Sequence, residues 1–359
     1  MALPEGVVAV LESHRDALPS QADKRTARRR LDIAAGATWA KKGTLALTDQ
    51  ALFSGGNFLV NVLLARALRP AEYGAFSIAY AVFMLFAALH AAILIEPMMV
   101  FAAGKYAKRF STYLLRVFWG HLALVTPASL LLLGVAMGLG HLYSREAQRA
   151  LLGLALGAVA ILFFWLVRQS FYVLLRPDRA VIGGAVYTAL LLGSIALLSS
   201  TGHLSTFTAF LGMAFAGLLT SVLMLARFNP VWKADRGEPT FANTLRTHWR
   251  YGRWAMATSV IGWIPGYSYY AVLPASLGLE ASGALRALAN LPLPVLQAIS
   301  SLSMLLLPLL VRRRHEGGHR QMTRTLLIFL GLFFAGSSLY GLTLWLFRDQ
   351  AFQFFYGGK

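Results

Sequence analysis

One apolar stretch, residues 47 to 76, carries polar side chains that could bind a substrate inside a membrane. At about 100° per residue, one face of a helix here would hold Gln50, Ser54, Asn57 and Asn61. Amides and hydroxyls cannot face lipid without losing hydrogen bonds, so this polar stripe must meet protein or a water-filled cavity. Hydrogen bonding between helices and the lining of a transport route are both open as its role.

Two acids near the predicted membrane boundary are candidates for ion coupling or gating. Asp49 directly precedes the stripe, where a carboxylate is stabilised by a helix N-terminus, so we favour capping over proton coupling. Glu96 precedes Pro97 at the end of the second apolar stretch. Because acids at membrane depth are functional suspects, a gating or coupling role for Glu96 also stays open.

Two arginines are candidates for binding an anionic headgroup, because a guanidinium matches the geometry of a phosphate or diphosphate. Arg168 lies close enough to a membrane surface to snorkel, which is the simpler expectation for it. Arg286 shares a helix face with Asn290 through their i, i+4 spacing. We therefore expect Arg286 and Asn290 to be the cavity candidates of the second half of the sequence.

The stretch WAMATSVIGWIPGYSYYAVLP contains a helix break, because Pro265 and Gly266 interrupt it in mid-span. Broken membrane helices are typical of transport sites and bending elements. The aromatic residues around the break could stack on sugar rings, although a belt at the membrane interface is the commoner reason for them. They are Trp263, Tyr267, Tyr269 and Tyr270. Pro292 and Pro294 predict a second kink.

The composition assigns these residues to an all-α integral membrane protein. The 359 residues are 57% hydrophobic and 13% charged, with a mean hydropathy of +0.59, well above that of an ordinary soluble domain. The sequence has no cysteine, and it shows no HExxH, P-loop or GxSxG pattern. We therefore expect neither an enzyme nor a metal or cofactor site.

Apolar stretches and basic residues together predict the topology. Nine stretches are long enough to cross the roughly 30 Å hydrocarbon core: 45–68, 74–96, 114–138, 150–173, 181–200, 207–227, 254–274, 284–311 and 322–347. With a cytoplasmic N-terminus, 26 of the 33 Lys and Arg residues fall on the inner side. The net charge of +18 then reflects topology and attraction to anionic lipids, and we expect no nucleic-acid partner.

The predicted spans divide into two unequal lobes. We expect a basic cytoplasmic tail (1–46), a lobe of six spans (47–227), a cytoplasmic linker (228–253) and a partial lobe of three spans (254–359). A shift of 209 residues aligns LLARALRPAEYGAF (63–76) with VLPASLGLEASGAL (272–285), which includes Gly74 on Gly283. Six-span units return to their starting side, so the repeats would be parallel, with the second lobe incomplete and the sequence truncated at its C-terminus.

Several segments resemble the polysaccharide-biosynthesis, O-antigen flippase-like branch of the multidrug/oligosaccharidyl-lipid/polysaccharide (MOP) exporter superfamily. They are TDQALFSGGNFLVNVLLARALRPAEYGAFSIAYA, ILIEPMMVF, GALRALANL with LLLPLL, and the terminal FYGGK. The resemblance covers about residues 45 to 359. It implies a two-lobed bundle in the cell inner membrane that encloses a cationic cavity. It also implies ion-coupled transfer of an undecaprenyl-diphosphate-linked oligosaccharide to the outer leaflet. Polysaccharide assembly proteins are candidate partners.

Three other functions remain as alternatives. A drug or cation exporter of the same superfamily favours acids deep in the first lobe, whereas Asp49 and Glu96 lie near its predicted inner surface. An integral-membrane glycosyltransferase or polymerase needs catalytic carboxylates on sizeable outer loops, and the predicted outer loops are short and poor in acids. A non-transporting, truncated membrane protein is the third alternative.

Overall fold

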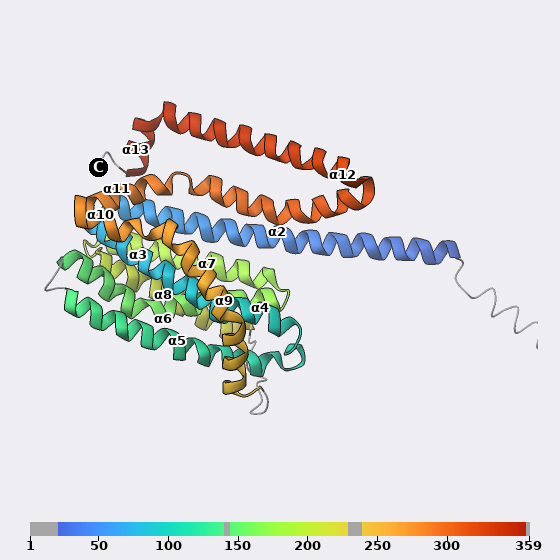
Figure 1. The fold of residues 1–359 in the computed structure, drawn as a ribbon, viewed down its shortest axis with the longest axis horizontal. Helices are drawn as coiled ribbons and strands as arrows, with labels where there is room; N and C mark the ends of the chain where they lie inside the picture. Colours follow the sequence, from blue (N-terminus) through green and yellow to red (C-terminus); the bar gives the residue numbers. More distant parts are fainter. Residues whose placement is uncertain (1–20, 140–143, 229–238, 357–359) are drawn as a thin grey trace, which may run out of the picture.

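The computed structural model describes residues 21–139, 144–228 and 239–356, which form helices and short connections without any strand (Figure 1). The first half contains α2 (Gln21–Ala67), α3 (Pro70–His90), the π-helical turn η1 (Ala91–Ile95), α4 (Glu96–Ala103), the 3₁₀ turn η2 (Ala107–Arg109), α5 (Phe110–Leu139), α6 (Arg145–Val173), α7 (Pro177–Ser200) and α8 (Thr206–Phe228). The second half contains α9 (Phe241–Tyr267), α10 (Tyr269–Leu277), α11 (Leu279–Asn290), α12 (Leu293–Leu346) and α13 (Arg348–Tyr356).

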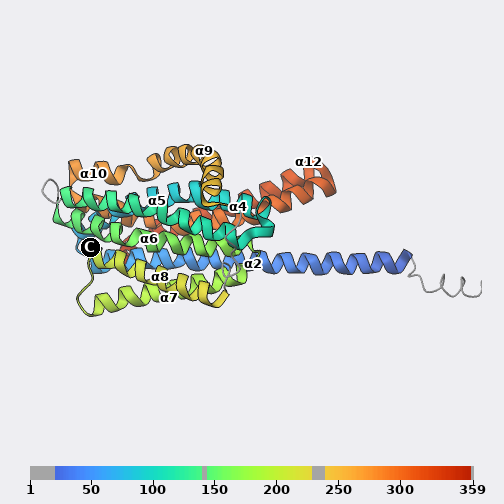
Figure 2. The ribbon, with the colours of Figure 1, turned by 90° about the horizontal axis from the view of Figure 1, so that it is seen from below.

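The core lies in the first half, where the helices from α3 to α8 pack side by side (Figures 1 and 2). Helix α6 occupies its centre, against α8, α5 and α3. Small residues allow this close packing: a Cβ added at Gly153 of α6 would lie 2.8 Å from backbone atoms of Phe207. Close contact through small residues is the usual way in which membrane helices associate, because lipid supplies no hydrophobic driving force between them.

Six segments among the described residues are long and apolar enough to cross a membrane: Pro70–Ala102, Ala107–Gly138, Arg145–Val173, Pro177–Ser200, Thr206–Phe228 and Gly318–Leu346. They include six of the nine predicted spans. The predicted spans 45–68, 254–274 and 284–311 are largely helical but fall outside this set. For 45–68 the reason is the polar stripe, whose amides lower the hydropathy of the helix.

Two predicted boundaries lie inside helices. Helix α2 is unbroken from Gln21, so the boundary expected after residue 46 is not a structural one, and the first part of α2 extends beyond the bundle (Figures 1 and 2). The predicted linker 228–253 is partly helical, since α9 begins at Phe241, while 229–238 lie outside the described residues. Helix α12 continues through the residues between the predicted spans 284–311 and 322–347 and folds back near Gly318, whose φ is +68° (Figure 1).

The turn between α2 and α3 is closed by an ion pair. Glu72 pairs with Arg69 at 3.2 Å. Arg69 is the N-cap of α3 and Glu72 is its N3 residue, and the Glu72 carboxylate also accepts a hydrogen bond from the Arg69 backbone N–H at 3.4 Å.

The two windows that the 209-residue shift aligns meet in space. A Cβ added at Gly283 of α11 would lie 3.1 Å from the backbone nitrogen of Gly74 in α3. Helices α3 and α11 therefore join the two halves through glycines.

Gly74 gives a prediction about stability. A Cβ at this position would lie 1.8 Å from the carbonyl oxygen of Leu279, which is backbone and cannot rotate away. We expect Gly74→Ala to destabilise the protein by about 1–3 kcal/mol because α3 and α11 must separate. The check is thermal unfolding in detergent, with Gly331→Ala as the control because its Cβ meets nothing within 4 Å. Equal melting temperatures for both variants would contradict the close approach.

Candidate functional site

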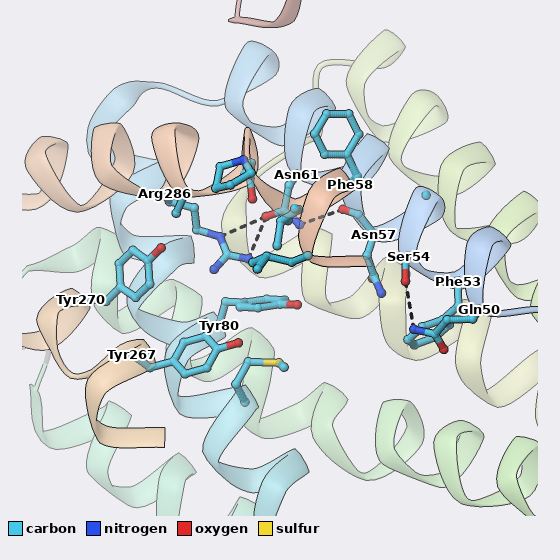
Figure 3. A pocket seen from close by; sticks show the side chains of 18 of the residues that line it. Gln50, Phe53, Ser54, Asn57, Phe58, Asn61, Tyr80, Tyr267, Tyr270 and Arg286 are labelled. Atoms are coloured by element: carbon cyan, nitrogen blue, oxygen red, sulfur yellow. Dashed lines mark hydrogen bonds between the residues drawn. The ribbon is translucent and has the colours of Figure 1, made fainter. Parts of the chain in front are cut away.

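A cavity of about 830 Å³ lies between α2 and the second half of the protein, with α3 and α6 contributing to its wall (Figure 3). Its volume falls within the roughly 300–1,000 Å³ that is typical of small-molecule sites. The wall includes Gln50, Ser54, Asn57 and Asn61 from α2 and Arg286 and Asn290 from α11. The structure thus brings together six of the seven residues predicted to bind substrate.

The polar stripe of α2 is held by local hydrogen bonds. The Gln50 side chain donates to Ser54 Oγ at 3.1 Å, and Asn61 Nδ2 donates to the carbonyl oxygen of Asn57 at 2.8 Å. Figure 3 shows these side chains along one side of the cavity. Of the two roles left open by the sequence, the geometry favours the lining of a cavity for Gln50, Ser54 and Asn57, which are only partly buried.

Asn61 combines both roles, because it lines the cavity and also positions Arg286. Its Oδ1 accepts hydrogen bonds from Arg286 Nε at 3.0 Å and from Nη2 at 2.9 Å. The guanidinium carbon of Arg286 lies 3.8 Å from the ring centroid of Tyr80, which supports it from the other side (Figure 3). Arg286 is therefore fixed between an amide and an aromatic face.

Arg286 brings a positive charge into the cavity wall without a carboxylate to neutralise it. Its side chain is buried, and within the described residues no acid forms an ion pair with it. Its hydrogen bonds through Nε and Nη2 both go to the neutral amide oxygen of Asn61. Since a buried cation is costly without a partner, this arrangement is poised to receive an anion.

Asn290 lies one helical turn beyond Arg286 and is also held in place. Its Nδ2 donates to the Tyr73 hydroxyl at 3.1 Å, which links α11 to α3. The hydroxyl of Tyr356 in α13 donates to the carbonyl oxygen of Ala287 at 2.8 Å. Helix α11 therefore enters the site between α3 and α13.

Arg168 is the one predicted substrate-binding residue that does not line the cavity. It neither snorkels nor faces substrate, because it is buried and forms a two-point ion pair with Asp49, with distances of 3.1 and 2.6 Å. The Tyr172 hydroxyl also donates to Asp49. A Cβ at Gly184 would lie 2.7 Å from Asp49 Oδ1, so a glycine is needed where α7 covers the pair.

The expectation that Asp49 is a hydrated helix cap is wrong. Because α2 begins at Gln21, Asp49 lies within the helix, and its side chain is fully buried. Phe53 separates the ion pair from the cavity: it lines the cavity, and the guanidinium carbon of Arg168 lies 4.5 Å from its ring centroid. The pair thus supports the cavity wall from behind.

The remaining gating candidates have different positions. Glu96 is exposed and begins α4 directly after the π-helical turn, away from the cavity lining. Pro265 lies inside α9 and is exposed, whereas Gly266 lines the cavity. The predicted break is present but slightly later, since α9 ends at Tyr267 and α10 begins at Tyr269. The second kink is also present, between Asn290 and Leu293.

Aromatic residues complete the cavity wall. Tyr267, Tyr269 and Tyr270 line the cavity, which favours their less expected role in substrate contact, while Trp263 donates to the carbonyl oxygen of Ala81 at 2.9 Å. Sequence reasoning missed Tyr80, whose ring lies beneath Arg286 (Figure 3). Nothing in the apolar sequence around Tyr80 distinguishes it from a residue that packs in the core.

No protein-family model and no curated protein matches the sequence. Among solved structures, the protein is similar to the MATE multidrug transporter DinF-BH in complex with R6G, with 13% identity, a TM-score of 0.65 and coverage of 89% of this sequence and 74% of that one. It is also similar to the inward-facing conformation of a multidrug resistance MATE family transporter of the MOP superfamily (15% identity, TM-score 0.63, coverage 85% and 72%).

A third similar structure is a MOP superfamily transporter from Pyrococcus furiosus, whose binding pocket is described as having a reverse polarity that suggests a different function (14% identity, TM-score 0.60, coverage 89% and 73%). The fold is therefore that of the MOP superfamily transporters, a multi-pass, all-helical membrane fold. This agrees with the predicted fold class, and the two-lobed arrangement is consistent with it. At identities of 13–15%, TM-scores of 0.60–0.65 show the fold alone and leave the substrate to the chemistry of the cavity.

Proposed function

We propose that the protein is a membrane transporter whose cavity binds the anionic headgroup of an amphiphilic substrate, with a lipid-linked, diphosphate-bearing oligosaccharide as the substrate class. The main support is the charge of the cavity wall. Arg286 is its one ionisable residue other than tyrosine among the described lining residues, and no acid lines it. Guanidinium and amide groups suit a phosphate or diphosphate, and tyrosine rings suit the faces of sugars.

The same arrangement gives each residue a role. Arg286 supplies a positive charge, and Asn57 and Asn61 supply amides along α2. Tyr267 and Tyr270 supply aromatic faces near Arg286 (Figure 3). The cavity volume admits a headgroup rather than a whole polyprenyl tail, so the lipid tail would stay in the bilayer. We place the N-terminus in the cytoplasm, as the distribution of basic residues predicts.

A drug exporter is the second candidate, and the fold comparisons favour it at least as well, since similar structures are described as multidrug transporters. Organic cations bind best to buried carboxylates and aromatic faces. Here the buried acid Asp49 is already neutralised by Arg168 and lies behind the cavity wall. A cationic substrate would then face Arg286 without a compensating acid, which is why we place this candidate second.

One binding experiment separates the two candidates. The purified protein in nanodiscs is titrated with a short prenyl diphosphate that carries one N-acetylhexosamine, and separately with R6G. We expect saturable binding of the prenyl diphosphate sugar that is competed by the unlabelled compound, and at least about tenfold weaker binding of R6G. Saturable R6G binding without binding of the diphosphate would overturn the proposal in favour of a drug exporter.

A further inference from the structure

Two histidines that the cavity does not use lie together inside the first-half bundle. His90 is the last residue of α3, and His121 is in α5; both side chains are buried, with 1% and 0% exposed. His90 Nε2 lies 3.0 Å from His121 Nδ1, and the two rings meet edge to face at 87°. His121 Nε2 lies 3.1 Å from the carbonyl oxygen of Val159 in α6.

The carbonyl group at the end of this series of hydrogen bonds determines where the protons are. Because a carbonyl oxygen only accepts, His121 must carry its proton on Nε2, and its Nδ1 must be the acceptor. His90 must therefore donate from Nε2, which leaves the lone pair of His90 Nδ1 as the only open basic position of the pair. His90 Nδ1 is buried and has no hydrogen-bond partner among the described residues.

The pair can accept one proton and no more. A proton added at His90 Nδ1 leaves both existing hydrogen bonds intact, whereas a second proton would place two imidazolium ions in contact. Among the described residues, no ion pair involves His90 or His121. Near the π-helical turn, the Tyr113 hydroxyl and His248 Nε2 are hydrogen-bonded to each other at 2.6 Å. Glu96, the residue that follows this turn, is exposed.

The position of the pair matches a coupling site. His121 and Val159 lie near the midpoints of the spans Ala107–Gly138 and Arg145–Val173. The π-helical turn η1 follows His90 directly, and π-helical turns occur often at functional sites and can rearrange. The Ile93 carbonyl within η1 is held by His248 Nδ1 of α9 at 2.9 Å, so this turn contacts both halves of the protein.

We propose that the pair His90–His121 is a proton-binding site, and that protons are the ions coupled to transport through the cavity. This inference rests on the proposed transporter function and names its coupling ion. The present structure shows the proton-free state, since an N–H at His90 Nδ1 would have no acceptor among the described residues. Proton binding favours a second conformation in which η1 rearranges and gives that N–H a partner. A ligand shifts such an equilibrium only through its different affinity for the two states.

The test variant is His90→Gln, because its amide N–H replaces the Nε2 donor to His121 while the titratable Nδ1 is removed. In proteoliposomes with an imposed pH gradient, we expect gradient-driven transport of the prenyl diphosphate sugar or of R6G to fall at least about tenfold in this variant. Equilibrium binding of the same probe should stay within about twofold. His203→Gln is the matched control, because His203 is exposed at the turn between α7 and α8.

A second measurement needs no substrate. Solid-state nitrogen NMR of the histidine-labelled protein in bilayers should show both rings protonated on Nε2 at pH 8. On acidification, one imidazolium signal that is absent from the His90→Gln protein should appear. Gradient-driven transport that His90→Gln leaves unchanged, or a pair that stays neutral throughout the acidification, would overturn the proposal. If the wild type transports neither probe, the transporter function fails, while the NMR result still decides whether the pair binds a proton.

Discussion

Replacing Arg286 with glutamine should weaken binding of the prenyl diphosphate sugar by at least about 30-fold. The variant removes the positive charge in the cavity wall, with which no carboxylate of the described residues forms an ion pair, and loss of one partner of a buried charged contact costs about 2–5 kcal/mol. Each 1.4 kcal/mol corresponds to about a factor of ten in affinity. The measurement is a titration of wild type and variant in nanodiscs. Arg286→Lys should retain part of the affinity, because it keeps the charge without the planar fork.

Arg348→Gln is the control for a general effect of charge, because its side chain is largely exposed. We expect it to bind the probe like the wild type. If Arg286→Gln binds equally well while remaining folded, Arg286 does not hold the headgroup. If Arg286→Gln instead improves R6G binding and leaves the diphosphate unaffected, the cavity is a cation site from which Arg286 repels the natural substrate.

Replacing Asp49 with alanine should cause the largest loss of stability, about 3–5 kcal/mol. The change leaves the guanidinium of Arg168 buried without its two carboxylate contacts, and an uncompensated buried charge is strongly destabilising. It also removes the acceptor of the Tyr172 hydroxyl. The measurement is unfolding by a denaturing detergent, followed by loss of helical circular dichroism.

Two further variants separate the ion pair from general damage. In Asp178→Ala, the pair Arg176–Asp178 is lost, but its side chains are 49% and 44% exposed, so the cost should stay below about 1 kcal/mol. The double variant Asp49→Leu, Arg168→Met should regain most of the stability, because an apolar pair replaces both charges. A single variant Asp49→Ala with wild-type stability would contradict the buried ion pair.

The polar stripe and the fold class could be predicted from the sequence, because both depend on local regularities. Helical periodicity places Gln50, Ser54, Asn57 and Asn61 on one face, and hydrocarbon forbids that face from meeting lipid. The i, i+4 spacing of Arg286 and Asn290 likewise places both residues on one face of a helix. These are properties of single helices, and the structure shows the residues lining one cavity.

The partners of these residues could not be predicted, because they depend on which helices become neighbours. Asp49 and Arg168 read separately as a cap and a snorkelling side chain, yet they neutralise each other across α2 and α6. Tyr80 gives no signal until Arg286 lies over its ring. The pair His90–His121, in contrast, could have been found from the sequence. Both histidines are ionisable residues within apolar spans, which is the same signal that made Glu96 a candidate.

The most direct test of the anionic headgroup site is a cryo-electron microscopy structure of the protein in nanodiscs with the prenyl diphosphate sugar bound. We predict density for the diphosphate within hydrogen-bonding distance of the Arg286 guanidinium, with the sugar near Tyr267 and Tyr270 and the prenyl tail leaving the cavity toward lipid. Diphosphate density elsewhere, with the contacts of Arg286 to Asn61 and Tyr80 unchanged and the cavity empty, would contradict the account.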